Sequence, residues 1–458
     1  MSTLVAHRTA VRTRPARVVL ELARLEGLRL IRHPIFIAGA ILSVAFFGLM
    51  TWNKAPVLHR DGVLSVGALL PLAVSTLVVA NYAAIRAARD GTTELYEGLP
   101  TDARTRTLGR LVSLLWGAAG AVVVLGVMFT YLALDAPVGT LDPLEVAAGP
   151  AEVVLFGATG IVLGRWRTHV AIAPIAALVL VGLEIVLIQP IIGLETLASR
   201  TPWLAPWVPS SLTGGVPPEL TIRPAGWHLL YLAGLIAVAG AGAVLGRGRT
   251  KVVAVLVAGG LVASAGGFAQ LRPASDEQRA RLGALLQRPE GFQVCTERGG
   301  TEFCAYPSYV PWVDRWARAV AGALAPVPSD DRPTGLVVRQ TFGTYFEGVV
   351  DVPKAAVRAL RHRKSDDIEV GFQWGRWATE GLYEIGLTLP FTMRAVGLPT
   401  DRSDIRLTAS DVELLTRTVL PQFRKERRAR VAANRLQPGK PWEGCHTLGQ
   451  ARAVIALW

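Results

Sequence analysis

Seven apolar runs, each close to the length of a membrane-spanning helix, constrain this chain more than any other feature of its sequence. A helix needs about 20 apolar residues to cross the hydrocarbon core of a bilayer. The runs therefore predict a polytopic, all-α membrane bundle, and the positive mean hydropathy of +0.37 agrees with that class. The predicted spans are Pro34–Thr51, Leu64–Ala87, Leu108–Leu134, Val146–Gly164, Val170–Ile192, Trp227–Leu245 and Val252–Gln270.

Basic residues are distributed unevenly over the segments between these spans. If the N-terminus is inside, the inner segments carry 17 arginines and lysines and the outer loops carry 4. Positive charge accumulates on the cytoplasmic side of membrane proteins. We therefore expect a multi-pass protein of the plasma membrane, with a cytoplasmic N-terminus and an extracytoplasmic C-terminus. The arginines are scattered over short loops, so a nucleic-acid partner is not expected.

The chain divides into a membrane part and a C-terminal part of different composition. Residues 1–33 predict a cytoplasmic tail with an interfacial amphipathic helix, although a positively charged tail that only sets the topology is an alternative. Residues 34–246 predict a six-span unit, and residues 252–270 a seventh span. Residues 271–458 have no run long enough to cross a membrane and predict a small extracytoplasmic α+β domain.

Local patterns support the α+β prediction for the C-terminal domain. Capping residues or an early proline predict helices, and β-rich runs predict strands. The predicted helices are residues 275–286, 352–363 and 410–436, and the predicted strands are Gly335–Thr341 and Tyr345–Val352.

All three cysteines fall in the C-terminal domain. Cys295 and Cys304 flank a Gly-Gly turn in CTERGGTEFC, which is typical of a hairpin. Because the predicted topology places this domain on the oxidising side, we expect a disulfide between them. Two buried free thiols are the alternative. Cys445 stands next to His446, and a lone Cys-His pair does not predict a metal site.

Motifs for catalysis and nucleotide binding are missing from the sequence. The chain has no GxxxxGK[ST], HExxH, GxSxG or CxxC. We therefore expect no catalytic residues, no cofactor and no metal in this chain, and any ATP hydrolysis would come from a partner subunit.

Glu184 lies near the middle of the fifth predicted span, in VLVGLEIVLIQP. A carboxylate inside a membrane is costly and usually faces a protein interior or a water path. Glu184 is therefore a candidate translocation-path residue, or else a hydrogen-bonded carboxyl that only holds helices together. Asn81, near the inner end of the second span, is expected to serve helix packing.

A charged segment of 25 residues, Arg86–Arg110, interrupts the apolar sequence. Within it, Thr92–Gly98 predicts a short helix, with polar residues to cap it and a glycine and a proline to end it. Glu94 and Glu97 are three residues apart and share a face of that helix. Thr101 can cap the following helix. An ordinary solvated loop is the alternative, although the other inner loops are short.

Two groups of residues form a loose pattern over about half of the chain. The first group, ahead of the first span, is Glu21, Arg29, Arg32 and Pro34. The second, in the charged segment, is Arg89, Gly91, Thr92, Glu94, Leu95, Leu99, Pro100, Thr101 and Arg104. This order of elements resembles the type-2 exporter class of ABC transporter permeases.

The resemblance implies that the charged segment holds a coupling helix, which docks on a separate ABC ATPase subunit. It also implies a second permease subunit, in a homodimer or heterodimer around the path of the exported substrate. The implied ATPase-coupling residues are Arg89, Gly91, Thr92, Glu94, Leu95, Tyr96, Glu97, Pro100 and Arg104. The seventh span and the C-terminal domain are additional to the usual six spans. A membrane sensor or immunity protein, which binds a ligand through its outer domain, is the alternative function.

Overall fold

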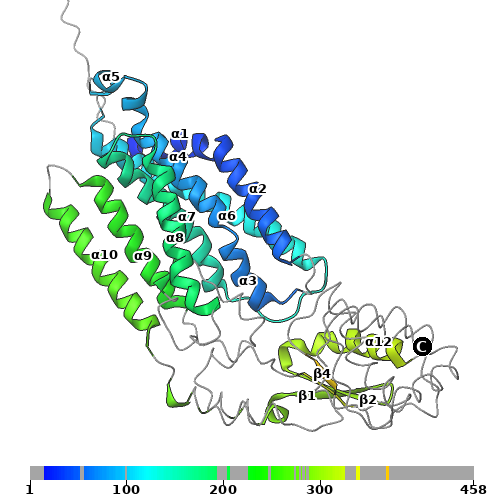
Figure 1. Cartoon of the computed structure of the whole chain (residues 1–458). Coiled ribbons are helices and arrows are strands. Elements are labelled where there is room, and N and C mark those ends of the chain that lie inside the picture. Colours follow the sequence, from blue (N-terminus) through cyan, green and yellow to red (C-terminus); the bar gives the residue numbers. More distant parts are fainter. Residues whose placement is uncertain are drawn as a thin grey trace, which may run out of the picture.

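The computed structural model describes residues 15–51, 56–97, 101–192, 204–206, 225–245, 249–272, 275–277, 280, 284, 288–324, 337–340 and 368–370. These residues form a long helical bundle with a small domain at one end (Figure 1). The helices of the bundle are α1 (Pro15–Ile31), α2 (Pro34–Thr51), α3 (Leu58–Gly67), α4 (Leu70–Arg89), α5 (Thr93–Glu97), α6 (Ala103–Ala133), α7 (Pro143–Trp166), α8 (Ile172–Ile192), α9 (Ala225–Val244) and α10 (Arg249–Gln270).

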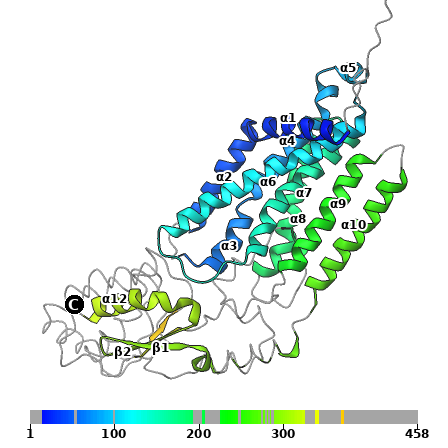
Figure 2. The same ribbon diagram turned by 180° about the vertical axis from the view of Figure 1, so that it is seen from behind.

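Six helical segments of the described chain are long and apolar enough to cross a membrane. They are α2, α3 with α4, α6, α7, α9 and α10, and they coincide with six of the predicted spans. The remaining predicted span, Val170–Ile192, coincides with α8, whose described side chains over Ile172–Leu187 form a shorter apolar helix. The protein is therefore a multi-pass membrane protein with a helical bundle. Figure 2 shows the same helices from behind.

The second predicted span, Leu64–Ala87, is not one continuous helix. A turn at Ala68–Leu69 separates α3 from α4, because Pro71 has no N–H group and its ring obstructs a continuing helix. The N–H of Leu72, in the first turn of α4, donates a hydrogen bond of 3.2 Å to Oγ of Ser43 on α2. In a bilayer such a group must find its partner within the protein. The predicted span is confirmed within Leu58–Arg89, but it consists of two helical segments.

The core of the bundle lies among α2, α4, α6 and α7. Gly160 allows close contact there, because a Cβ at this position would lie 2.2 Å from the carbonyl oxygen of Leu77 on α4. One turn further along α4, Nδ2 of the buried Asn81 donates to the carbonyl oxygen of Gly160 at 3.1 Å. The packing role predicted for Asn81 is confirmed.

The described C-terminal domain is a mixed sheet with short helices. Its elements are η4 (Pro289–Phe292), β1 (Val294–Arg298), β2 (Thr301–Ala305), η5 (Pro307–Trp312), α12 (Val313–Leu324), β3 (Val337–Gln340) and β4 (Ile368–Val370). The strand order is β1-β2-β3-β4, with β1 antiparallel to β2, and β3 parallel to both of its neighbours. The strand predicted near residues 335–341 is confirmed as β3, whereas α12 and β4 were not predicted.

The hairpin of β1 and β2 is confirmed. Its two turn residues, Gly299 and Gly300, have φ angles of 60° and 77°. A two-residue hairpin turn of type I′ requires positive φ at both positions, which glycine adopts without strain. In the resulting register Cys295 lies directly opposite Cys304.

Several predicted features of the C-terminal domain lie outside the described residues. They are the helices at 352–363 and 410–436, the strand at Tyr345–Val352, and the Cys445–His446 pair. The helix predicted at 275–286 is described only at residues 275–277, 280 and 284.

Candidate functional site

The predicted coupling segment lies at the end of the bundle away from the C-terminal domain (Figures 1 and 2). At this end α1 crosses the bundle, and α5 stands beyond the ends of α4 and α6. Loop residues and helix ends from three parts of the sequence therefore meet there.

The short helix predicted at Thr92–Gly98 is present as α5, Thr93–Glu97. Gly91, which has a φ of 65°, follows the end of α4 and reverses the chain. Glu94 and Leu95 are exposed, Leu95 to 73 %. The side chains of Tyr96 and Glu97, and the whole of Pro100, lie outside the described residues.

The helix after α5 is capped by Asp102, not by Thr101 as predicted. Asp102 has the extended backbone typical of a cap, and its carboxylate accepts the N–H of Thr105 at 2.9 Å. Hydrogen bonds from Thr105 lower the pKa of Asp102, assisted by the charges of Arg104 and Arg106 and opposed by burial. Arg104 is exposed on the first turn of α6.

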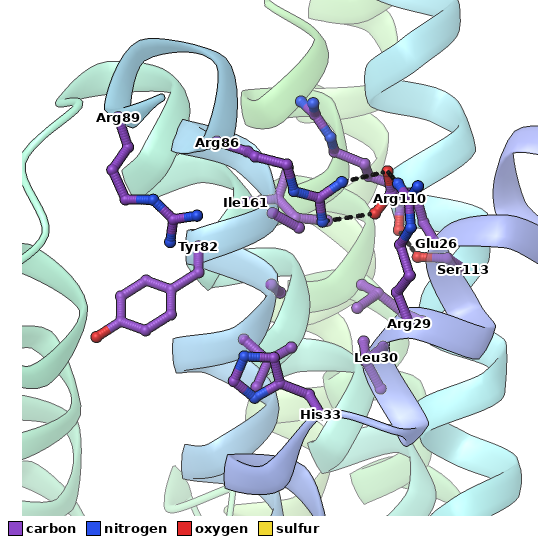
Figure 3. Close-up of a pocket in the computed structure, with 14 residues that line it drawn as sticks. Glu26, Arg29, Leu30, His33, Tyr82, Arg86, Arg89, Arg110, Ser113 and Ile161 are labelled. Carbon is purple, nitrogen blue, oxygen red and sulfur yellow. Dashed lines mark hydrogen bonds and ion pairs between the residues drawn. The ribbon is translucent and has the colours of Figure 1, made fainter. Parts of the chain in front are cut away.

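An ion pair ties α1 to the end of α4, at the first residue of the charged segment. Nη1 and Nη2 of Arg86 donate to the two carboxylate oxygens of Glu26 at 3.0 and 3.1 Å (Figure 3). Arg29 donates to the same carboxylate at 3.2 Å. A bidentate pair of this kind fixes orientation as well as supplying energy. Sequence reasoning did not single out Glu26, because its partner lies 60 residues away.

A cavity of about 170 Å³ lies beside this ion pair, among α1, α4, α6 and α7 (Figure 3). Its lining contains four arginines and one carboxylate, so these groups carry a net charge of +3. The arginines are Arg29, Arg86, Arg89 and Arg110, and the carboxylate is Glu26. The arrangement suits an anionic group.

His33, between α1 and α2, also lines the cavity. Its Nδ1 accepts the N–H of Ile35 at 3.2 Å, which requires this nitrogen to be unprotonated. Burial lowers the pKa of His33, and the positive charges of Arg86 and Arg89 lower it further. The ring is therefore neutral at pH 7.

Inside the bundle, Glu184 of α8 is buried, as the sequence led us to expect, with 3 % of its surface exposed. The structure adds Glu152 of α7, which is fully buried and close enough to Glu184 to interact electrostatically. Neither carboxylate oxygen of Glu152 has a hydrogen-bond partner within the described part of the chain. The same signal, an acid in an apolar helix, could have identified Glu152 from the sequence. A buried pair of carboxyl groups suits a translocation path and also suits a contact that only holds helices together, the two roles considered for Glu184.

At the other end of the bundle, the hairpin brings Sγ of Cys295 and Cys304 to the disulfide distance of 2.02 Å. Residues after the hairpin contact the helix ends. The hydroxyl of Tyr309 lies 3.1 Å from Nε2 of His59, and Arg315 donates to the carbonyl oxygen of Asp135 at 2.8 Å. The C-terminal domain is therefore joined to both the α3 and the α6 side of the bundle.

A buried ion pair fixes the beginning of α3 at this end. Nε of Arg60 lies 2.6 Å from the carboxylate of Asp61, and the two side chains are 3 % and 0 % exposed. Asp61 also accepts the N–H of Val57 at 2.8 Å. Val57 in turn forms a parallel bridge with Val138, in the loop between α6 and α7.

Comparison with known proteins does not assign the chain to a family. No protein-family model matches it, and no curated protein matches it. The resemblance to type-2 exporters therefore rests on the order of the elements and on the residues of the charged segment.

Proposed function

We propose that this chain is the transmembrane permease subunit of an ATP-driven ABC exporter. A separate ATPase subunit docks on the Arg86–Arg110 segment, and a second permease subunit completes the path of the substrate. The N-terminus and the charged segment face the cytoplasm, and the C-terminal domain faces outward.

The observation that carries this proposal is α5. A five-residue helix has too few hydrogen bonds to be stable alone, so it is held by the helices that flank it. It offers the exposed Glu94 and the 73 % exposed Leu95 at the end of the bundle. An apolar side chain beside a charge, on a short helix that projects from the bundle, suits a docking contact better than an ordinary solvated loop does.

The helices connected to α5 could transmit its displacement to the rest of the bundle. α4 leads into the charged segment and α6 leads out of it, so displacement of α5 acts on two helices at once. Arg86 of α4 is held by Glu26, which adds α1 to the same unit. ATPase closure against α5 would therefore move three helices together.

The orientation rests on two independent observations. The inner segments carry 17 basic residues against 4 in the outer loops, which favours a cytoplasmic N-terminus. The disulfide-distance pair of Cys295 and Cys304 lies in the domain that this topology places outside. Disulfides persist on the oxidising side of a membrane.

The test is purification of the full-length chain from its native membranes, followed by assay of ATP hydrolysis in the recovered complex. The variant Glu94→Lys with Leu95→Ala alters two exposed side chains of α5. Charge inversion at a docking contact lowers complex yield, and we expect a loss of about tenfold. Insertion into the membrane should be unchanged, because both positions are exposed and outside the spans.

The matched control is Glu297→Lys with Glu302→Lys, which inverts two exposed, directly paired glutamates at the other end of the molecule. It should retain the ATPase. If the α5 variant inserts normally and recovers the full ATPase activity, α5 is not the docking site.

A sensor or immunity function is the second candidate. The contacts Tyr309–His59 and Arg315–Asp135 favour it, because they connect the C-terminal domain to helix ends and could relay ligand binding. Recovery of the intact chain with no ATP-hydrolysing partner, from membranes in which it is expressed normally, would favour this candidate over export.

A further inference from the structure

We propose that the basic cavity among α1, α4, α6 and α7 binds the phosphate of an acidic phospholipid headgroup. The cavity shares Arg86, Arg89 and Arg110 with the charged segment of the export proposal, so its test measures bound lipid and not recovery of an ATPase.

The charge of the cavity is the first argument. A single carboxylate, Glu26, accepts hydrogen bonds from both Arg86 and Arg29, so one negative charge is shared between two positive ones. Arg89, which also pairs with the exposed Asp90 at 2.9 Å, and Arg110 add two further guanidinium groups to the lining. The planar donor fork of arginine matches the oxygens of a phosphate. These side chains come from α1, α4 and α6 (Figure 3), so the cluster is a product of the fold.

The shape of the cavity is the second argument. Its volume of about 170 Å³ exceeds the share of one water molecule in the liquid, about 30 Å³, several-fold. The lining also has an apolar part, which includes Leu30, Val79, Leu114 and Ile161. A site with cationic groups beside apolar ones fits a phosphate that carries an attached glycerol and acyl chains.

The position of α1 is the third argument, and it favours a lipid over a soluble anion. Ala23 and Leu30 of α1 are buried against the bundle, whereas Leu20 and Leu25 are 62 % and 55 % exposed. A helix with exposed leucines and arginines that lies across the end of a membrane bundle belongs in the headgroup region. Acidic lipids are concentrated there, and arginines attract them.

The experiment measures lipid retention by the purified full-length chain, using native mass spectrometry. The probes are phosphatidylglycerol and phosphatidylcholine, added at equal concentration, with inorganic phosphate in a separate arm. The test variant Arg29→Gln with Arg110→Gln removes two cavity charges and leaves the Arg86–Glu26 pair in place. The matched control Arg165→Gln with Arg167→Gln removes two exposed charges at the end of α7.

We expect the native chain and the control to retain phosphatidylglycerol preferentially, and the test variant to lose roughly tenfold or more of that preference. A second variant, Glu26→Gln, releases Arg86 and should strengthen retention of phosphatidylglycerol. It keeps the test informative if the double variant fails to fold, as judged by circular dichroism and gel filtration.

Three results would overturn the proposal. The first is equal retention of the two lipids by the native chain. The second is an equal loss of preference in the control and the test variant. The third is displacement of phosphatidylglycerol by millimolar inorganic phosphate, which would assign the cavity to a soluble anion.

Discussion

The charged side chains at the two ends of the bundle differ in their exposure to solvent. Beside the C-terminal domain, Arg60 and Asp61 are paired and almost completely removed from solvent. At the other end, the side chains of Arg86 and Glu26 are 26 % and 15 % exposed, and that of Arg29 is 62 % exposed.

This difference separates a structural end from the end at which we propose binding. A buried charge is costly to desolvate, so it is retained only where its partner and its hydrogen bonds are complete. Such a pair holds one geometry and has no capacity for a ligand. Around Glu26, the side chains of Arg29, Arg86 and Arg89 all reach solvent, as the proposed phosphate site requires. Three substitutions test the comparison, in order of decreasing effect.

The largest effect is expected from Asp61→Ala. It leaves the guanidinium of Arg60 buried without its carboxylate and removes the acceptor of the Val57 N–H. Loss of one partner of a buried pair costs about 3–5 kcal/mol. The measurement is the free energy of unfolding of the purified chain in detergent. The control is Asp314→Ala, which breaks the exposed pair with Arg298 and should cost less than about 1 kcal/mol. If the two variants lose the same free energy of unfolding, the Arg60–Asp61 pair does not stabilise its end of the bundle more than an exposed pair does.

Arg86→Ala should have an intermediate effect, because its ion pair with Glu26 is only partly buried. We expect a loss of about 1–2 kcal/mol, between the values for exposed and buried pairs. Amide hydrogen exchange should accelerate in α1 and remain unchanged in α3. Arg24→Ala, at an exposed position of α1, is the control and should leave the exchange of α1 as it is. If amide exchange in α1 is as slow in the Arg86 variant as in the native chain, this ion pair does not anchor α1.

The smallest effect is expected from Asp102→Ala, which removes the cap of α6 at the end of the bundle away from the C-terminal domain. A lost cap costs about 0.5–1 kcal/mol, here toward the lower value because Asp102 is exposed. Since the pKa of Asp102 is lowered in the folded state, its contribution is fully present above the ordinary value of 3.8. That contribution is lost as the pH falls through the lower pKa of the folded state.

Exchange of the Thr105 amide, followed as a function of pH, measures the effect of this cap. The control is Asp142→Ala, which removes the corresponding cap of α7 near the C-terminal domain. It should accelerate exchange in the first turn of α7 and leave Thr105 protected. If the exchange of Thr105 is the same with and without Asp102, the cap does not stabilise the coupling segment.

Features that depend on neighbouring residues could be predicted from the sequence. The length of the apolar runs predicted the six candidate spans of the described chain, whereas the beginning of the second span at Leu58 and its break at Pro71 were missed. The Gly-Gly turn predicted the hairpin that brings Cys295 opposite Cys304. Polar residues and glycines predicted α5 to within a residue at each end. The physical reason is that helix length, turn conformation and capping are decided over a few residues.

Contacts between distant segments were decided only by the tertiary structure. Arg86 meets Glu26 across 60 residues, and Tyr309 meets His59 across 250. The sequence could not indicate these pairs because lipid and protein interior are equally apolar, so a uniformly apolar helix such as α8 does not reveal which face packs inward. The basic cavity and the buried pair of Glu152 and Glu184 depend on that choice of faces. The sequence by itself determined where the chain forms long apolar helices and turns, and packing of the helices decided which charges meet.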